Sequence, residues 1–175
     1  MIVNRNALLA AAPIKNMLGC KHRKHGVSFG LSEAGYDICI KQDIRFSGMR
    51  ALRLDIDDPS LSTPHVMVAG KRFEGQFALA SAVEEFQMPP NLVGTVKDKS
   101  TWARQGLSVF NTVIEPGWNG FLTLELVYHG YEPLHIPAGA GIAQVLFERI
   151  DVPNAYAGKY QNQEDRPVES KFVNS

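Results

Sequence analysis

The chain has 175 residues, of which 45% are hydrophobic and 21% are charged, and its 18 basic and 18 acidic side chains give a formal net charge of zero. This composition is ordinary for a chain that buries a core, so it excludes wholesale disorder and predicts one domain. Affinity for nucleic acid depends on clustered Lys and Arg side chains. The neutral balance therefore argues against nucleic acid as the main partner and restricts any anion site to a local cluster.

The N-terminal apolar stretch predicts neither a membrane span nor a secretion signal. Residues 7–14 are far fewer than the roughly 20 that a membrane-spanning helix needs, and Arg5 is the only basic residue before them. We therefore expect a cytoplasmic protein that does not bind a membrane. In that compartment Cys20 and Cys39 are expected to stay reduced rather than form a disulfide.

The first predicted element is a short helix. Asn4 is a cap-type residue, strong helix formers follow it to Ala12, and Pro13 ends the pattern. Beyond Pro13 helical periodicity disappears, and short apolar runs are separated by Gly, Pro, Asn and Asp at intervals of about 8 to 12 residues. This spacing predicts an all-β sandwich or barrel and makes a parallel α/β sheet unexpected.

The apolar runs predict strands, and the polar end of the chain predicts an arm. We expect the folded domain at residues 1–153. Residues 154–175 are polar and without pattern, which is typical of a disordered tail or of an arm that orders over a ligand. The predicted strands are residues 36–40, 49–56, 77–83, 92–97, 107–112, 121–128, 134–136 and 143–147.

Glu125 is the most unusual residue of the predicted strands. Strand alternation puts Leu122, Leu124 and Leu126 on one face of residues 121–128 and puts Glu125 on the other, among apolar neighbours. A buried carboxylate there requires a shifted pKa or a cationic partner. A strand whose second face is solvated would show the same pattern, so the alternation leaves both interpretations open.

Three polar segments could bind a ligand. Residues 97–104 place two hydroxyls between cations, which suits a phosphate, although a solvated loop looks the same. Residues 156–163 contain a Lys, two Tyr and carboxamide side chains that could hold a triphosphate. Residues 20–25 contain Cys20, His22 and His25, but their spacing has no established zinc geometry, so we expect an exposed basic loop. The His-x-Glu and Pro-Cys-x-x-Cys signature of zinc deaminases is absent.

Six segments form an ordered set: AGYDI at 34–38, KSTWARQGL at 99–107, EPGWNG at 115–120, TLEL at 123–126, GIAQVLF at 141–147 and GKYQNQ at 158–163. Taken in order, they resemble the dCTP deaminase family, whose relatives are the trimeric dUTPases. The resemblance implies a distorted antiparallel β-barrel of jelly-roll type that assembles as a homotrimer, with each active site at a subunit interface. It also implies a deaminase that needs no zinc.

The resemblance implies a reaction and assigns residues to it. Glu125 would take a proton from the water that attacks C4 of the cytosine ring of dCTP and would deliver it to the leaving amine, so that dUTP and ammonia form. Ser100 would hold the water, and Arg104 would pair with Glu125. Main-chain groups of Thr123 and Leu124 would bind the pyrimidine edge. The sugar and the triphosphate, with its Mg²⁺, would be held by Lys99, Thr101, Gln144, Tyr156, Lys159 and Gln163.

Two departures from the family pattern affect the expected phosphate and sugar contacts. The chain has Lys99-Ser100-Thr101 where the family has Arg-Ser-Ser, and Lys loses the bidentate geometry of Arg. Glu115 stands where family members have an Asp next to the deoxyribose. The alternative enzyme is a dUTPase, alone or combined with deamination so that dCTP gives dUMP, although the longer Glu115 side chain and the missing Gly-rich C-terminal arm of dUTPases argue against it. A catalytically idle nucleotide-binding trimer is an alternative of another class.

Overall fold

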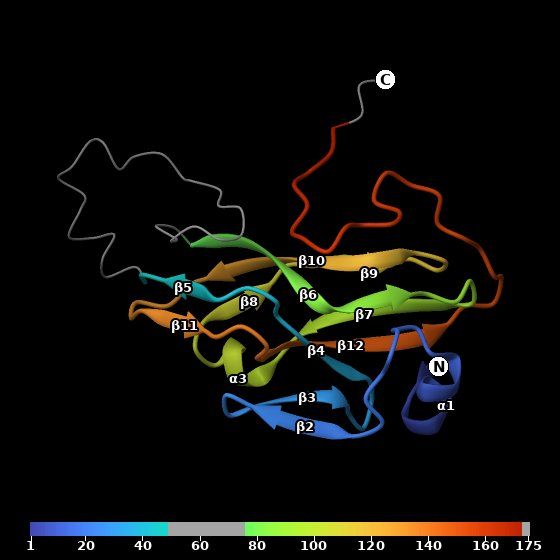
Figure 1. The fold of residues 1–175 in the computed structure, drawn as a ribbon, viewed down its shortest axis with the longest axis horizontal. Coiled ribbons are helices and arrows are strands. Elements are labelled where there is room, and N and C mark those ends of the chain that lie inside the picture. Colours follow the sequence, from blue (N-terminus) through green and yellow to red (C-terminus); the bar gives the residue numbers. More distant parts are fainter. Residues whose placement is uncertain (49–75, 173–175) are drawn as a thin grey trace.

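The computed structural model describes residues 1–48 and 76–172 (Figure 1). In these ranges the chain forms twelve strands and two short helices, which confirms the all-β prediction. The helices are α1 (Arg5–Ala11) and α3 (Ser100–Ala103). The strands are β1 (Ile2–Val3), β2 (Lys21–Lys24), β3 (Val27–Leu31), β4 (Tyr36–Cys39), β5 (Ile44–Phe46), β6 (Phe77–Gln87), β7 (Leu92–Asp98), β8 (Leu107–Val109), β9 (Val113–Ile114), β10 (Asn119–Tyr128), β11 (Leu134–Ile136) and β12 (Gly141–Arg149).

The strands pair into three antiparallel sheets. The largest has the order β2-β3-β4-β12-β7-β9, with β1 also paired to β12, while β6-β10-β8 and β11-β5 form the other two. In the described ranges the first two sheets are joined through the isolated bridge between Ile40 and Ala82, not through a continuous ladder. The barrel that the resemblance implies is therefore not closed in this part of the chain.

The core fills the space between the two larger sheets. Ile38 and Phe147 come from the seven-stranded sheet, Leu124 and Leu126 come from β10, and all four are fully buried.

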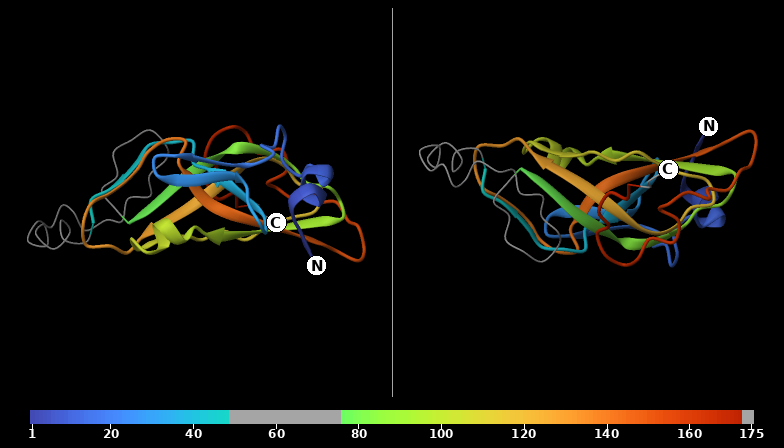
Figure 2. Two further views of the ribbon diagram at one scale, coloured as in Figure 1. Left: turned by 90° about the horizontal axis from the view of Figure 1, so that it is seen from below. Right: turned by 90° about the horizontal axis from the view of Figure 1, so that it is seen from above.

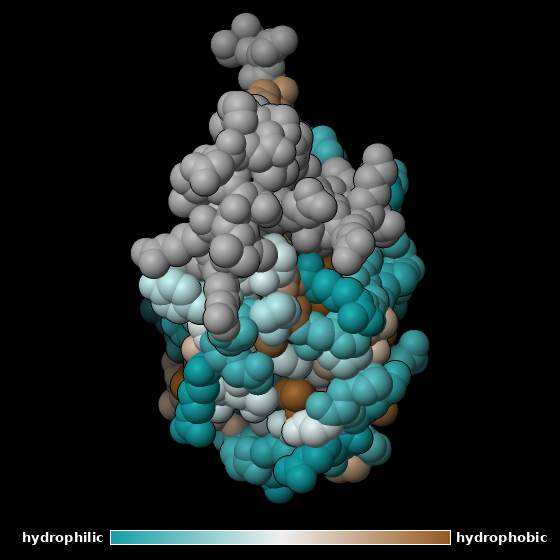
Figure 3. All heavy atoms as spheres, turned by 90° about the vertical axis from the view of Figure 1, so that its left-hand side faces the viewer, coloured by the Kyte–Doolittle hydropathy of each residue, from teal (hydrophilic) through white to brown (hydrophobic). Residues whose placement is uncertain are grey.

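The molecule is elongated, with α3, β5 and β11 toward one end and α1 toward the other (Figures 1 and 2). The face at the β5–β11 end is mostly hydrophilic where its residues are described (Figure 3). No helix in the described ranges is long and apolar enough to cross a membrane.

The predicted helix is confirmed, and so are most of the predicted strands. Helix α1 begins after Asn4 and buries Leu8, and Ala12 ends it in the left-handed conformation at φ 45°. The predicted strand at 107–112 is shorter than expected, because β8 ends at Val109. The predicted strand at 49–56 lies outside the described residues.

The basic segment near Cys20 is not a loop, as predicted, but strand β2. Its four side chains are all exposed. Among the described strands it pairs only with β3, at the edge of the seven-stranded sheet. The two strands are joined at His25 and Gly26, whose positive φ angles of 52° and 77° form a tight turn. Backbone pairing through such a turn needs no apolar side chain, which is why the hydrophobic pattern missed it.

Candidate active site

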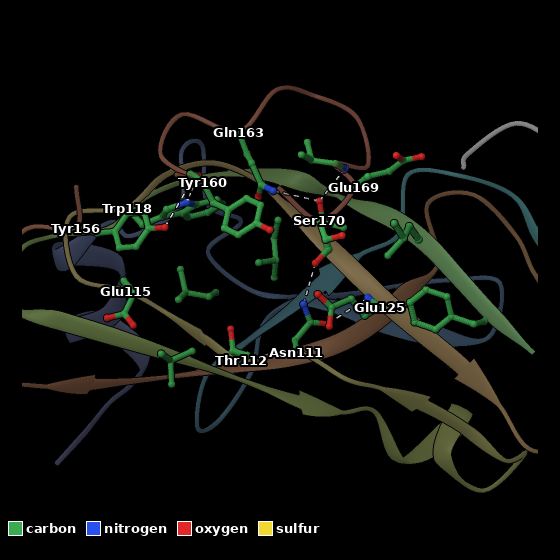
Figure 4. Close-up of a pocket in the computed structure, with 17 residues that line it drawn as sticks. Asn111, Thr112, Glu115, Trp118, Glu125, Tyr156, Tyr160, Gln163, Glu169 and Ser170 are labelled. Carbon is green, nitrogen blue, oxygen red and sulfur yellow. Dashed lines mark hydrogen bonds between the residues drawn. The ribbon is translucent and has the colours of Figure 1, made fainter. Parts of the chain in front are cut away.

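A cavity of about 720 Å³ lies between β10, the β8–β10 connection and the C-terminal arm (Figure 4). Most of the residues around it are apolar or aromatic, with several hydroxyl and amide groups. Three carboxylates line it, from Glu115, Glu125 and Glu169, and no Lys, Arg or His of the described ranges does. The complete lining is Phe77, Leu79, Asn111, Thr112, Val113, Ile114, Glu115, Trp118, Leu122, Thr123, Glu125, Tyr156, Tyr160, Gln163, Val168, Glu169 and Ser170.

A bulge in β10 shapes the wall of this cavity. The register between β10 and β6 shifts between Phe121 and Thr123. Strict alternation would place Leu122 with the core residues Leu124 and Leu126, but the bulge brings both Leu122 and Thr123 to the cavity. Regular alternation resumes after it, so Leu124 is fully buried and Glu125 faces the cavity.

The sequence left open whether Glu125 is a buried carboxylate or an exposed one. In the structure its side chain is half-buried, between these two possibilities. Burial raises the pKa of its carboxyl above the ordinary value. Its main chain is firmly held, because its carbonyl accepts the Phe110 N–H at 2.8 Å. A carboxyl with a raised pKa that opens onto a cavity has the properties of a general acid and base.

The side chain of Asn111 connects the main-chain groups of Thr123 and Glu125 in the β10 wall of the cavity. Its Nδ2 donates to the Thr123 carbonyl at 2.8 Å, and its Oδ1 accepts the Glu125 N–H at 3.4 Å (Figure 4). One side chain thus bridges main-chain groups on both sides of Leu124. Asn111 fell inside the predicted strand at 107–112, and for that reason the sequence pattern did not single it out.

The C-terminal arm covers the other side of the cavity. Gln163 forms a parallel bridge with Gly120, and the Trp118 Nε1 donates to the Tyr160 carbonyl at 2.6 Å. The close approach requires glycine at position 120, where φ is 128° and an added Cβ would lie 2.5 Å from the Gln163 nitrogen. Farther along, the Val168 N–H donates to Thr123 Oγ1 at 3.0 Å.

Gln161 anchors the arm with four hydrogen bonds. Its Oε1 accepts from the N–H groups of Asn119 and Asn162, at 2.8 and 3.2 Å. Its Nε2 donates to the carbonyls of Gly117 and Tyr156, at 2.9 and 3.0 Å. A polar residue in a patternless tail carries no sequence signal for this role.

The remaining predicted residues form a second group that does not line the cavity. Ser100, Thr101 and Arg104 are exposed on α3 or at its end. Lys99 and Gln144 both contact the buried carboxylate of Asp37, through Lys99 Nζ at 2.5 Å and Gln144 Nε2 at 3.1 Å. One chain therefore separates the predicted site into a cavity group and a group around α3.

Lys159 belongs to the arm but not to the cavity lining. Its ammonium donates to the Lys171 carbonyl and lies 5.2 Å from the centre of the Tyr160 ring. Tyr160 is thereby flanked by two cations, because Lys171 Nζ lies 5.6 Å from the same ring.

The described residues contain no group of three or more His, Cys, Asp or Glu side chains that could hold a metal ion. Cys20 and Cys39 are free thiols.

Comparison with known proteins identifies the family. Residues 18–150 match the family model described as dCTP deaminase-like. The dCTP deaminase of Roseiflexus castenholzii is 38% identical over 147 residues, covering 78% of this chain and 79% of that protein. The dCTP deaminase of Herpetosiphon aurantiacus is 38% identical over 148 residues, with the same coverage. This chain belongs to the dCTP deaminase family.

One solved structure is similar to this chain in fold. A dUTPase of Staphylococcus bacteriophage 80alpha, solved with dUpNHpp, has a TM-score of 0.50 and is 16% identical, with 83% of this chain and 91% of that chain covered. The family model ends at residue 150, so the part of the arm that closes the cavity lies beyond it. The architecture around β10 belongs to the dCTP deaminase-like domain, and the arm adds Tyr156, Tyr160 and Gln163 to it.

Proposed function

We propose that this protein is an enzyme that hydrolytically deaminates dCTP to dUTP and ammonia, with Glu125 as general base and general acid. The observation that carries the proposal is the position of Glu125, half-buried with a raised pKa in the wall of the cavity. The carboxylate takes a proton from water, and the water oxygen attacks C4 of the cytosine ring. The same proton then passes to the amine, the C4–N bond breaks, and ammonia leaves. The second proton of the water moves from the new C4 hydroxyl to N3, which gives the 4-carbonyl of uracil.

The geometry around Glu125 supports binding of the planar cytosine ring against the same wall of the cavity. The main-chain groups of Thr123 and Leu124 stand next to Glu125 and would bind the pyrimidine edge. Asn111 fixes this stretch of backbone from the side. Glu115 lines the cavity toward the arm and would lie at the deoxyribose, and Tyr156 and Gln163 would cover the sugar and the first phosphates.

The charges around the cavity support a site completed by a second chain. A triphosphate is strongly anionic, whereas the charged side chains that line the cavity in the described ranges are all carboxylates. The cations of α3, Lys99 and Arg104, lie outside the lining of the same chain. We propose that the protein forms a homotrimer in which Ser100, Thr101 and Arg104 of one subunit reach the cavity of the next. Ser100 would hold the attacking water, and Arg104 would orient Glu125.

The triphosphate itself would bring the metal ion. Mg²⁺ binds phosphate oxygens and keeps several water ligands, so it would enter with the nucleotide and offset part of its charge. Lys159 of the arm and Lys99 with Gln144 of the neighbouring subunit would hold the remaining phosphate oxygens. No zinc is assigned a role in this reaction.

The decisive experiment is to incubate the purified protein with dCTP and Mg²⁺ and to resolve dUTP, dUMP, ammonia and pyrophosphate by chromatography. The proposal predicts dUTP and ammonia in equal amounts. Formation of dUMP and pyrophosphate as well would identify the bifunctional enzyme, for which the carboxylate of Glu115 in the cavity could activate a second water. In a parallel incubation with dUTP and Mg²⁺, hydrolysis of dUTP by protein that leaves dCTP intact would show a dUTPase. Binding of dCTP without any product would show an idle trimer and refute the proposal.

Mixed oligomers test the shared site separately. Glu125→Gln and Arg104→Ala each disable a different part of the site, and each variant alone is expected to keep only a small fraction of the wild-type activity. If one subunit supplies Glu125 and the next supplies Arg104, a 1:1 mixture that exchanges subunits should regain about one quarter of the wild-type activity, since each site draws each chain at random. A mixture that exchanges subunits and regains no activity would exclude a shared site.

A further inference from the structure

Lys99 and Gln144 come from different elements but converge on one carboxylate, that of Asp37. Lys99 follows β7, Gln144 lies on β12, and Asp37 lies on β4 between β3 and β12 in the sheet. Asp37 is 2% exposed. It accepts hydrogen bonds from Lys99 Nζ at 2.5 Å, from Gln144 Nε2 at 3.1 Å and from Ser28 Oγ at 3.1 Å. A carboxylate buried this deeply needs such partners, so the whole cluster is a built feature of the sheet.

Asp37 fixes the orientation of both side chains. An ionised carboxylate only accepts hydrogen bonds, so the amide nitrogen of Gln144 must face Asp37, and it also donates to Ser32 Oγ at 2.9 Å. The Lys99 side chain is 11% exposed. With one N–H group of its ammonium directed at Asp37, two others are left to donate to a ligand. The carboxylate therefore removes most of the rotamer freedom of a long, flexible side chain before any ligand arrives.

The ion pair between Lys99 and Asp37 lies at the start of α3. Lys99 is the N-cap residue of this helix, and its carbonyl accepts the N–H groups of Trp102 and Ala103, each at 3.0 Å. Ser100 and Arg104 follow directly on the helix and at its end. An ion pair that holds the side chain of Lys99 to β4 therefore also fixes the point from which α3 begins.

We propose that Asp37 is a positioning residue for the phosphate end of the nucleotide, acting through Lys99 and Gln144. The inference rests on the proposed function, in which these two residues bind the triphosphate. Lys has one charged nitrogen on a flexible stem and lacks the planar, bidentate guanidinium of Arg. A fixed carboxylate compensates for this by holding the ammonium in one place, so that less entropy is lost when phosphate binds.

The test compares Asp37→Asn, Lys99→Met and the double variant with the wild-type protein. Steady-state kinetics give KM and kcat for dCTP, and calorimetry gives the affinity for inorganic tripolyphosphate. Loss of the anchor should raise KM and weaken tripolyphosphate binding by about 10- to 100-fold, because two side chains must then be immobilised on binding. The fall in kcat should be smaller than the rise in KM. In the Lys99→Met background, Asp37→Asn should weaken tripolyphosphate binding far less than it does alone, because Asp37 acts largely through Lys99.

Ser28→Ala is the matched control, since it removes a third donor from the same carboxylate but leaves Lys99 and Gln144 in place. Its KM and its tripolyphosphate affinity should equal those of the wild type. If Asp37→Asn does not fold, Asp37→Glu keeps the buried charge and displaces it, and KM should still rise. A folded Asp37 variant that binds tripolyphosphate as tightly as the wild type, or effects of Asp37→Asn and Lys99→Met that simply add, would overturn the inference. Tripolyphosphate binding decides this even if the wild type proves not to deaminate dCTP.

Discussion

Glu84 lies on β6, next to Cys39, the last residue of β4. Its two carboxyl oxygens accept the Cys39 N–H at 2.9 and 3.1 Å, and the next residue, Ile40, bridges Ala82 on β6. Burial raises the pKa of Glu84 to about 7, although the hydrogen bond from Cys39 opposes the shift. The thiol of Cys39 is neutral here, since burial and the nearby Glu84 raise its pKa to about 12. We therefore expect ionisation of Glu84 to destabilise the fold.

The size of the effect follows from the two pKa values. A rise from 4.5 to about 7 corresponds to roughly 3 kcal/mol, at about 1.4 kcal/mol for each pH unit. Because the folded pKa lies above the unfolded one, the folded state holds the proton more tightly. The stabilisation is complete below about pH 4.5 and is lost as the pH rises to about 7. Gln cannot ionise, so Glu84→Gln should be more stable than the wild type by about 3 kcal/mol at pH 8 and by less than about 1 kcal/mol at pH 5.

Urea unfolding at pH 5, 6, 7 and 8, at one protein concentration, measures this difference. The neighbouring Glu85→Gln is the control, because Glu85 forms a surface ion pair with Lys15 at 2.6 Å and both side chains are well exposed. Such a pair contributes about 0 to 1 kcal/mol, so the control should show no stabilisation that grows with pH. If Glu84→Gln is no more stable than the wild type at pH 8, burial does not shift this carboxyl and the reasoning is refuted.

Four further predictions concern the site. Glu125→Gln should lower kcat for dCTP deamination by about 10² to 10⁴ with little change in nucleotide affinity, and deamination at the parent rate would exclude Glu125 as the base. Arg104→Ala should move the acid limb of the kcat/KM profile to higher pH, since a cation lowers the pKa of Glu125; an unmoved limb argues against their contact. Deletion of residues 155–175, or Gln161→Ala, should raise KM and leave the oligomer intact in gel filtration, whereas an unaltered KM would mean that the arm does not bind nucleotide. Activity should survive a zinc-selective chelator, and stoichiometric zinc in active protein would contradict the mechanism.

The sequence pattern predicted best where local periodicity and burial agree. Helix α1 and the buried strands β6, β7, β10 and β12 follow apolar runs bounded by turn residues, so their existence could be read directly. Strand β2 could not, because its stability comes from backbone pairing with β3 and its side chains are all exposed. The bulge between Phe121 and Thr123 also leaves no sequence signal, so the presence of Leu122 in the cavity could not be predicted.

The site was predicted as a set of residues but not as an arrangement. Alternation drew attention to Glu125, and the resemblance supplied the remaining residues and implied a site at a subunit interface, but neither indicated which residues of one chain lie together. Asn111, Gln161 and Asp37 act through hydrogen bonds to main chain or to other polar side chains. Such contacts depend on which segments the fold brings together, and the residue type alone does not encode them.

The separation of charge gives a physical reason for assembly and catalysis to be coupled. In one chain the charged groups that line the cavity in the described ranges are carboxylates, and burial raises the pKa of Glu125 with nothing positive to oppose it. A raised pKa makes the carboxyl harder to ionise, and only the ionised form can take a proton from water. Arrival of Arg104 from a neighbouring subunit would lower the pKa and restore the carboxylate, while the half-buried setting keeps it basic enough to accept the proton. In the proposed trimer, the acid in the cavity of one subunit and the Arg104 cation at the end of α3 of the next would together form the working base.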